Sequence, residues 1–136
     1  MIGIHKKQVV IFFCQNMGYK KADLGQLLRL PHNVSTRFVE LPCSGKIEPQ
    51  FLLKIFETGI DAIFVLGCLD GTCHHVEGNR KMRKRVQYLK DILGEIDMDR
   101  DRLEMFQISS DPELDIEHVV SEIDKRITSL SPSPLK

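Results

Sequence analysis

The sequence predicts an α/β protein: a small doubly wound, parallel, four-stranded sheet with helices on both faces. Short apolar runs alternate with segments of helical spacing, in the order β-α-β-α-β-α-β-α, which favours parallel strands joined by right-handed crossovers. The apolar runs are rich in Val, Ile and Phe and nearly continuous, which is typical of strands buried on both faces. We therefore expect a flavodoxin-like strand order, 2-1-3-4, with a single domain over residues 1–130.

Four apolar runs are the expected strands. Each is short, and each is followed by a polar or glycine-containing stretch that suits a loop. The runs cover residues 8–13, 37–41, 62–66 and 103–108.

The four segments between and after these runs are the expected helices. Their apolar residues recur three and four positions apart, so that one face of each helix packs on the sheet. The segments cover residues 20–30, 49–58, 79–96 and 115–130.

In the second segment, Glu48-Pro49 suits the start of a helix and Gly59 suits its end. Four apolar residues share one stripe of this helix: Phe51, Leu52, Ile55 and Phe56. In the third, the residues predicted to face inward are Met82, Val86, Leu89, Ile92, Leu93 and Ile96. Residues 131–136, which contain Ser-Pro-Ser-Pro, are expected to form a flexible tail.

Composition narrows the class of protein. The apolar fraction of 42% and the charged fraction of 28% are ordinary for a soluble globular domain. A formal net charge of zero gives no reason to expect a nucleic-acid partner. No apolar stretch is long enough to cross a bilayer, and residues 9–14 lack a signal-peptide pattern, so we expect a cytoplasmic protein without a membrane partner.

The basic run at 80–85 is interpreted as a solvated helix face, with docking to an acidic surface as the alternative.

The four cysteines fall at one place in this predicted fold. Cys14 ends the first strand, Cys43 comes just after the second, Cys68 ends the third and Cys73 lies in the loop that follows. Because parallel strands all point the same way, these positions share the carboxyl edge of the sheet, where open α/β folds bind ligands. In a cytosolic chain such thiols are more often free thiols, catalytic groups or metal ligands than structural disulfides.

A set of four thiols suits zinc or an iron–sulfur cluster. The spacing is C-x28-C-x24-C-x4-C, without the paired C-x2-C knuckles of zinc ribbons. The glycines near them, Gly45, Gly67 and Gly71, let backbone N–H groups approach the sulfur atoms. A thiol–disulfide enzyme is disfavoured because no C-x-x-C is present. The simpler alternative is that Cys14 and Cys68 are small core residues at strand ends.

Several strings around these cysteines resemble one known family. They are F-C-Q-N-M-G-Y at 13–19, C-S-G-K-I-E-P at 43–49, and G-C-x4-C-H-x3-G-N at 67–79. In this order, over roughly residues 8–112, they resemble the delta subunit family of methyl-viologen-reducing hydrogenase, the small iron–sulfur partner of heterodisulfide reductase.

The resemblance implies an electron-transfer subunit with a [2Fe–2S] cluster. Such a subunit would pass electrons from a hydrogenase or formate dehydrogenase subunit toward the flavin subunit of a bifurcating heterodisulfide-reductase-type complex. Carried over position by position, it makes Cys14, Cys43, Cys68 and Cys73 the candidate cluster and metal ligands. No catalytic residue is expected, because the chain has no G-x-S-x-G, H-E-x-x-H or phosphate-binding glycine loop.

Two positions depart from the family pattern. Met17 stands where the family has the second cysteine of C-x-x-C, and a thioether is a poor ligand for such a cluster. His75 stands where an aromatic residue is typical; it is either a substitute ligand, as in Rieske-type centres, or a surface loop residue. His74 matches the family and is expected to hydrogen-bond near the cluster or to contact a neighbouring subunit. The alternatives that remain are a cluster-free docking module of the same kind of complex and a zinc-binding or thiol regulatory domain.

Overall fold

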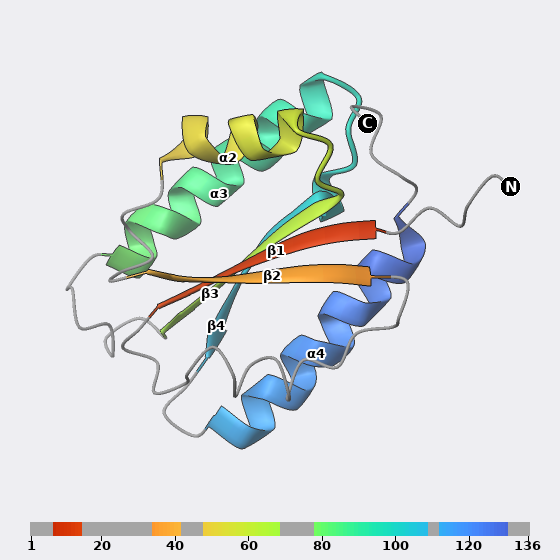
Figure 1. Ribbon diagram of the computed structural model, residues 1–136. Helices are drawn as coiled ribbons and strands as arrows, with labels where there is room; N and C mark the ends of the chain where they lie inside the picture. The colour runs from red at the N-terminus through yellow and green to blue at the C-terminus, as the bar shows by residue number, and fades with distance from the viewer. Residues whose placement is uncertain (1–6, 15–33, 42–47, 69–77, 109–111, 131–136) are drawn as a thin grey trace, which may run out of the picture.

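A computed structural model describes residues 7–14, 34–41, 48–68, 78–108 and 112–130. Its strands are β1 (Lys7–Cys14), β2 (Val34–Leu41), β3 (Ala62–Cys68) and β4 (Leu103–Ile108). All pairings between them are parallel, and the order across the sheet is β2-β1-β3-β4 (Figure 1). The predicted fold class and strand order are therefore confirmed.

Strand limits differ slightly from the prediction. β2 begins at Val34 because Val34, Ser35 and Thr36 pair with the first residues of β1. β3 runs through Gly67 to Cys68, because both residues pair with the end of β4. Pairing with a neighbouring strand, rather than apolar content, thus sets where β2 begins and where β3 ends.

Three helices lie within the described residues: α2 (Pro49–Glu57), α3 (Gly78–Glu95) and α4 (Pro112–Ser129). α2 starts with a proline in its first turn, directly after Glu48, whose backbone is extended. It ends shortly before Gly59, which has a φ of 94°, a left-handed backbone conformation that residues with a side chain rarely adopt. A 3₁₀ turn, η3 (Arg100–Arg102), precedes β4 and was not expected. The helix predicted over 20–30 and the tail predicted at 131–136 lie outside the described residues.

The helices form two layers around the sheet, with α2 and α3 on one face and α4 on the other (Figure 1). Alternate residues of β1 therefore enter different cores. Val9, Ile11 and Phe13 pack in the cluster that contains α4, whereas Val10 and Phe12 pack in the cluster that contains α2 and α3. This is the two-sided burial that the continuous apolar strands predict.

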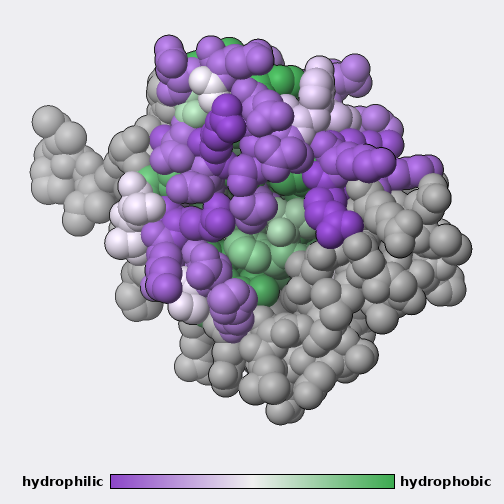
Figure 2. Space-filling model, turned by 180° about the vertical axis from the view of Figure 1, so that it is seen from behind, coloured by the Kyte–Doolittle hydropathy of each residue, from purple (hydrophilic) through white to green (hydrophobic). Residues whose placement is uncertain are grey.

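Two helix residues predicted to face inward do not. Ile96 is 54% exposed because α3 ends one residue earlier, at Glu95. Phe51 is 50% exposed, although Leu52 and Phe56 of the same stripe are buried. Seen from behind, the surface is mainly hydrophilic around a smaller hydrophobic area (Figure 2). None of the helices in the described ranges is both long and apolar enough to cross a membrane.

Candidate functional site

Two of the four cysteines end neighbouring strands. Cys14 is the last residue of β1 and Cys68 is the last residue of β3. Phe13 pairs with Leu66, so Cys14 comes one residue, and Cys68 two residues, beyond this pair. Adjacent strands are about 4.8 Å apart, and the strands are parallel. The backbones of both cysteines therefore reach the same carboxyl edge of the sheet.

The other candidate ligands lie outside the described residues. Cys43 follows Leu41, the last residue of β2, by two positions, and the Leu41 Cα is the partner of the Cys14 Cα. Cys73 follows the end of β3 by five positions. His74 and His75 fall in the same undescribed loop. Within the part of the chain that the structure describes, no three His, Cys, Asp or Glu side chains gather as a metal site. The four-cysteine ligand set therefore stays a prediction.

The strand ends next to the cysteines are apolar and closely packed. Phe13, Leu66 and Gly67 are buried. A metal–thiolate centre placed at this edge would have an apolar, low-dielectric wall on its sheet side. Burial of this kind is one of the factors that set the reduction potential of iron–sulfur clusters. The donor type and the surroundings therefore fit a thiolate-bound redox centre.

The opposite, amino edge of the sheet carries a buried polar pair that the sequence did not reveal. Asp61 and Arg102 are 1% and 2% exposed. The Asp61 carboxylate accepts a hydrogen bond from the backbone N–H of Gln8 at 2.7 Å, and the Arg102 Nη1 donates to the Asp61 carbonyl oxygen at 3.0 Å. Asp61 directly precedes an apolar strand, but nothing local marks its partners. This pair joins the starts of three strands and is structural.

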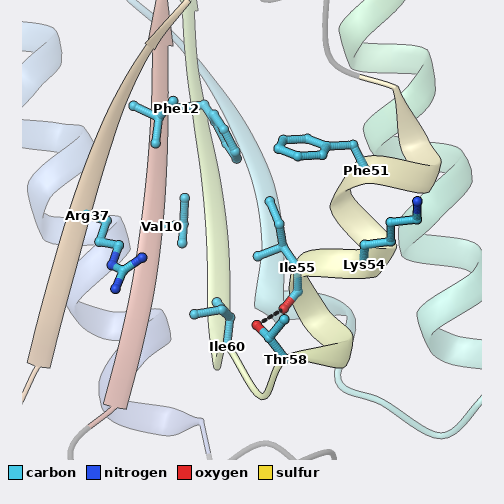
Figure 3. A pocket seen from close by; sticks show the side chains of 9 residues that line it. Val10, Phe12, Arg37, Phe51, Lys54, Ile55, Thr58 and Ile60 are labelled. Atoms are coloured by element: carbon cyan, nitrogen blue, oxygen red, sulfur yellow. Dashed lines mark hydrogen bonds between the residues drawn. The ribbon is translucent and has the colours of Figure 1, made fainter.

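A second feature missed by the sequence is a cavity of about 360 Å³ between β2 and α2, here called the β2–α2 groove. Val10 and Phe12 of β1 form its floor, Phe51 and Ile55 of α2 one wall, and Arg37 reaches over from β2 (Figure 3). The Phe51 ring meets that of Phe12 edge-on, with 6.1 Å between the ring centres. Exposed Phe51 is therefore part of a hollow in the surface. No periodicity in the sequence signals it.

Comparison with known proteins gives a family and several relatives. Residues 9–131 match the family described as methyl-viologen-reducing hydrogenase, delta subunit. The chain is 35% identical over 128 residues to the F420-non-reducing hydrogenase vhu iron-sulfur subunit of Methanocaldococcus jannaschii, covering 94% of this chain and 96% of that protein. It is 33% identical to the F420-non-reducing hydrogenase iron-sulfur subunit of Archaeoglobus profundus, covering 91% and 90% of the two chains.

One relative is much longer than this chain. It belongs to the ferredoxin:CoB-CoM heterodisulfide reductase of Methanosarcina mazei and is 33% identical over 131 residues. The match covers 94% of this chain but only 16% of that protein. A region similar to this chain thus occurs there as one part of a larger polypeptide.

Proposed function

The chain belongs to the methyl-viologen-reducing hydrogenase delta subunit family, and on this basis we propose that it is an electron-transfer subunit that holds a [2Fe–2S] cluster. Its place would be between the flavin subunit of a heterodisulfide-reductase-type complex and a hydrogenase or formate dehydrogenase subunit. Cys14, Cys43, Cys68 and Cys73 would hold the cluster.

The observation that carries this proposal is the arrival of Cys14 and Cys68 at one sheet edge on adjacent parallel strands. Strands fixed by pairing on both sides hold their last residues more rigidly than free loops do. β1 pairs with β2 and β3, and β3 pairs with β1 and β4. Two of the four proposed ligands would therefore be held in place by the fold before a cluster binds.

The chain's task in this role is to hold and shield, not to perform acid–base chemistry. When bound, a [2Fe–2S] cluster accepts and releases single electrons. The buried ends of β1 and β3 would exclude water on one side, and backbone N–H groups at Gly45, Gly67 and Gly71 would hydrogen-bond the sulfur atoms. Both effects tune the reduction potential.

The names of the relatives support a hydrogenase and a heterodisulfide reductase as partners. Iron–sulfur subunits of F420-non-reducing hydrogenases are similar to this chain over nearly their whole length, which favours a hydrogenase neighbour. The Methanosarcina mazei protein contains a similar region inside a longer polypeptide of a heterodisulfide reductase. A domain that is covalently joined to a reductase polypeptide in one protein is well suited to dock on such a polypeptide as a separate chain.

The experiment is anaerobic purification followed by measurement of iron and acid-labile sulfide, with an electron spin resonance spectrum of the reduced protein. We expect about two iron and two sulfide per chain and an S = 1/2 signal. Each Cys→Ser variant at 14, 43, 68 and 73 should lose most of the iron, whereas His75→Ala should keep it. Iron-free protein after reconstitution would refute the proposal, and zinc without sulfide would favour the zinc-binding or thiol regulatory domain.

Met17 supports a second candidate, a docking module of the same complex without a cluster. The family pattern implies a cysteine at this position, and the thioether of methionine is a weak ligand for such a cluster. The variant Met17→Cys separates the candidates. If the unmodified chain already holds iron and Met17→Cys adds none, the cluster-bearing role stands; if iron appears only in Met17→Cys, the docking module is correct.

A further inference from the structure

The β2–α2 groove is apolar inside but bordered by cations. Arg37 on β2 and Lys54 on α2 line it, and among the described residues no acidic side chain does. Within the described ranges no ion pair engages either Arg37 or Lys54. An apolar hollow between unmatched positive charges is complementary to an apolar side chain flanked by carboxylates.

Charge is distributed unevenly along the chain, although the formal net charge is zero. Residues 1–90 contain 14 Lys and Arg against 7 Asp and Glu, whereas residues 91–136 contain 5 against 12. β2, α2 and most of α3 belong to the basic part, while β4 and α4 belong to the acidic part. Much of the basic excess lies on α3, which packs against β4 and η3 as well as α2, so it does not mark one side of the sheet. At the groove the relevant charges are local: Arg37 and Lys54 line it, and they would attract an acidic segment of a partner.

Two features favour a polypeptide over a small molecule as the occupant. The groove is rimmed by exposed apolar side chains, with Val39 37% and Phe51 50% exposed, and a small ligand inside would leave them in water. In addition, β2 is an edge strand among the described strands, pairing only with β1. An edge strand beside a helix-walled groove is a known arrangement for binding an extended segment, in which backbone hydrogen bonds add to side-chain burial.

We propose that the β2–α2 groove docks an acidic, extended segment of a partner polypeptide. An apolar side chain of this segment inserts beside Phe12 and Phe51. Carboxylates on either side of it pair with Arg37 and Lys54. The match to one part of a longer reductase polypeptide supports such a contact with another polypeptide region. Phe12 and Val39 are each two residues from the strand ends at Cys14 and Leu41, or about 7 Å along the strand. A segment docked here would therefore lie close to the cysteine edge. This last point, but not the docking itself, rests on the proposed function.

The first test is site-directed photo-crosslinking in the complex as it is purified from cells. Benzoylphenylalanine replaces Phe51 in one form of the chain and Tyr88, which is 60% exposed on α3, in a control form. We expect position 51 to crosslink to a peptide of another polypeptide in which Asp or Glu flank an apolar residue, and mass spectrometry identifies that peptide. A crosslink from position 51 to a second copy of this chain, to a peptide without acidic residues, or to no protein would overturn the proposal.

The second test reverses the charges. The double variant Arg37→Glu with Lys54→Glu should reduce the crosslink yield from position 51 by about tenfold, because like charges then face the segment. The control, Arg100→Glu with Lys125→Glu, makes the same change in net charge at exposed residues of η3 and α4 and should leave the yield within about twofold. Equal losses in both double variants would contradict a specific groove contact.

Iron content separates this inference from the proposed function. If the groove variants lose the crosslink but keep the iron of the unmodified chain, both proposals stand. If the chain holds no iron but the crosslink and its charge dependence remain, only the cluster is refuted. Thermal unfolding of the groove variants, expected at the same temperature as the unmodified chain within a few degrees, confirms that the fold is intact.

Discussion

Arg102 donates a hydrogen bond to the backbone carbonyl of Asp61 at 3.0 Å, although 41 residues separate them and both are almost completely buried. Asp61 also exchanges two hydrogen bonds with Gln8, from its own N–H to the Gln8 carbonyl at 2.9 Å and from the Gln8 N–H to its carboxylate at 2.7 Å. Gln8, Asp61 and Arg102 lie at the starts of β1, β3 and β4. The pair therefore fastens the edge of the sheet opposite the cysteines.

Removal of the Asp61 carboxylate should weaken the fold. In Asp61→Ala, the backbone N–H of Gln8 loses its charged acceptor, and such hydrogen bonds contribute about 1.5–3 kcal/mol. We expect the free energy of unfolding, measured by urea denaturation, to fall by about 3 kcal/mol. Asp124→Ala, on the exposed side of α4, is the control and should change it by less than about 0.5 kcal/mol. Similar values for the two variants would show that the buried carboxylate is not important.

Glu104 connects the two helical layers across β4. One of its carboxylate oxygens lies 2.6 Å from Lys90 Nζ on α3 and 3.3 Å from Arg126 Nη1 on α4. The three side chains are between 15% and 22% exposed, so solvent screens them less than ordinary surface pairs. We expect Glu104→Gln to lower the free energy of unfolding by about 1–2 kcal/mol, since one carboxylate serves two cations.

Salt provides the check on this interpretation. The loss in Glu104→Gln should become smaller in 1 M salt, where the Debye length is about 3 Å. Glu95→Gln, which alters an exposed residue at the end of α3, should have little effect at either salt concentration. A loss that does not depend on salt would assign the role of Glu104 to packing.

Two phenylalanines of α2 should differ sharply in their contribution to stability. Phe56 is 1% exposed in the core under α2 and α3, whereas Phe51 is 50% exposed and contacts Phe12. Phe56→Ala should cost about 3–5 kcal/mol by leaving a cavity, and Phe51→Ala about 1 kcal/mol, the value of an edge-on aromatic contact. Urea denaturation of both variants measures this difference. Comparable losses would contradict the orientation of α2.

Gly94→Ala should stabilise the protein slightly. Gly94 is helical, in the last turn of α3, and alanine is favoured over glycine in a helix by up to about 1 kcal/mol. The added Cβ would meet the guanidinium of Arg100, a flexible, exposed side chain whose pair with Asp91, at 3.5 Å, is of little energetic value. We expect a gain of about 0.5 kcal/mol in thermal or urea unfolding. A loss above about 1 kcal/mol would show that Arg100 is held in place.

Much of the fold could be predicted because its signals are local. The alternation of apolar runs and helical stripes predicted the four strands and the three described helices, and the expected doubly wound, flavodoxin-like topology supplied the order 2-1-3-4. For the candidate site, the same reasoning predicted that Cys14 and Cys68 end neighbouring strands at one edge. The positions of Cys43 and Cys73, which lie outside the described residues, stay predictions, as does the cluster.

Other features could not be predicted, because they depend on contacts between residues far apart in the chain. The exposure of Phe51 and Ile96 contradicts their apolar spacing and follows from where α2 sits on the sheet and where α3 ends. Likewise, the hydrogen bonds of Asp61 and the bridge through Glu104 join residues 14 to 53 positions apart.

The sequence by itself determined the layered α/β architecture and the common edge for the cysteine-bearing strands, because strand direction and side-chain periodicity are written along the chain. Only the tertiary structure decided which polar groups meet in the interior and that a hollow opens between β2 and α2. The physical reason is that such contacts and voids arise from how finished helices and strands pack against each other. That packing depends on the shapes and lengths of several elements at once, which no single stretch of sequence encodes.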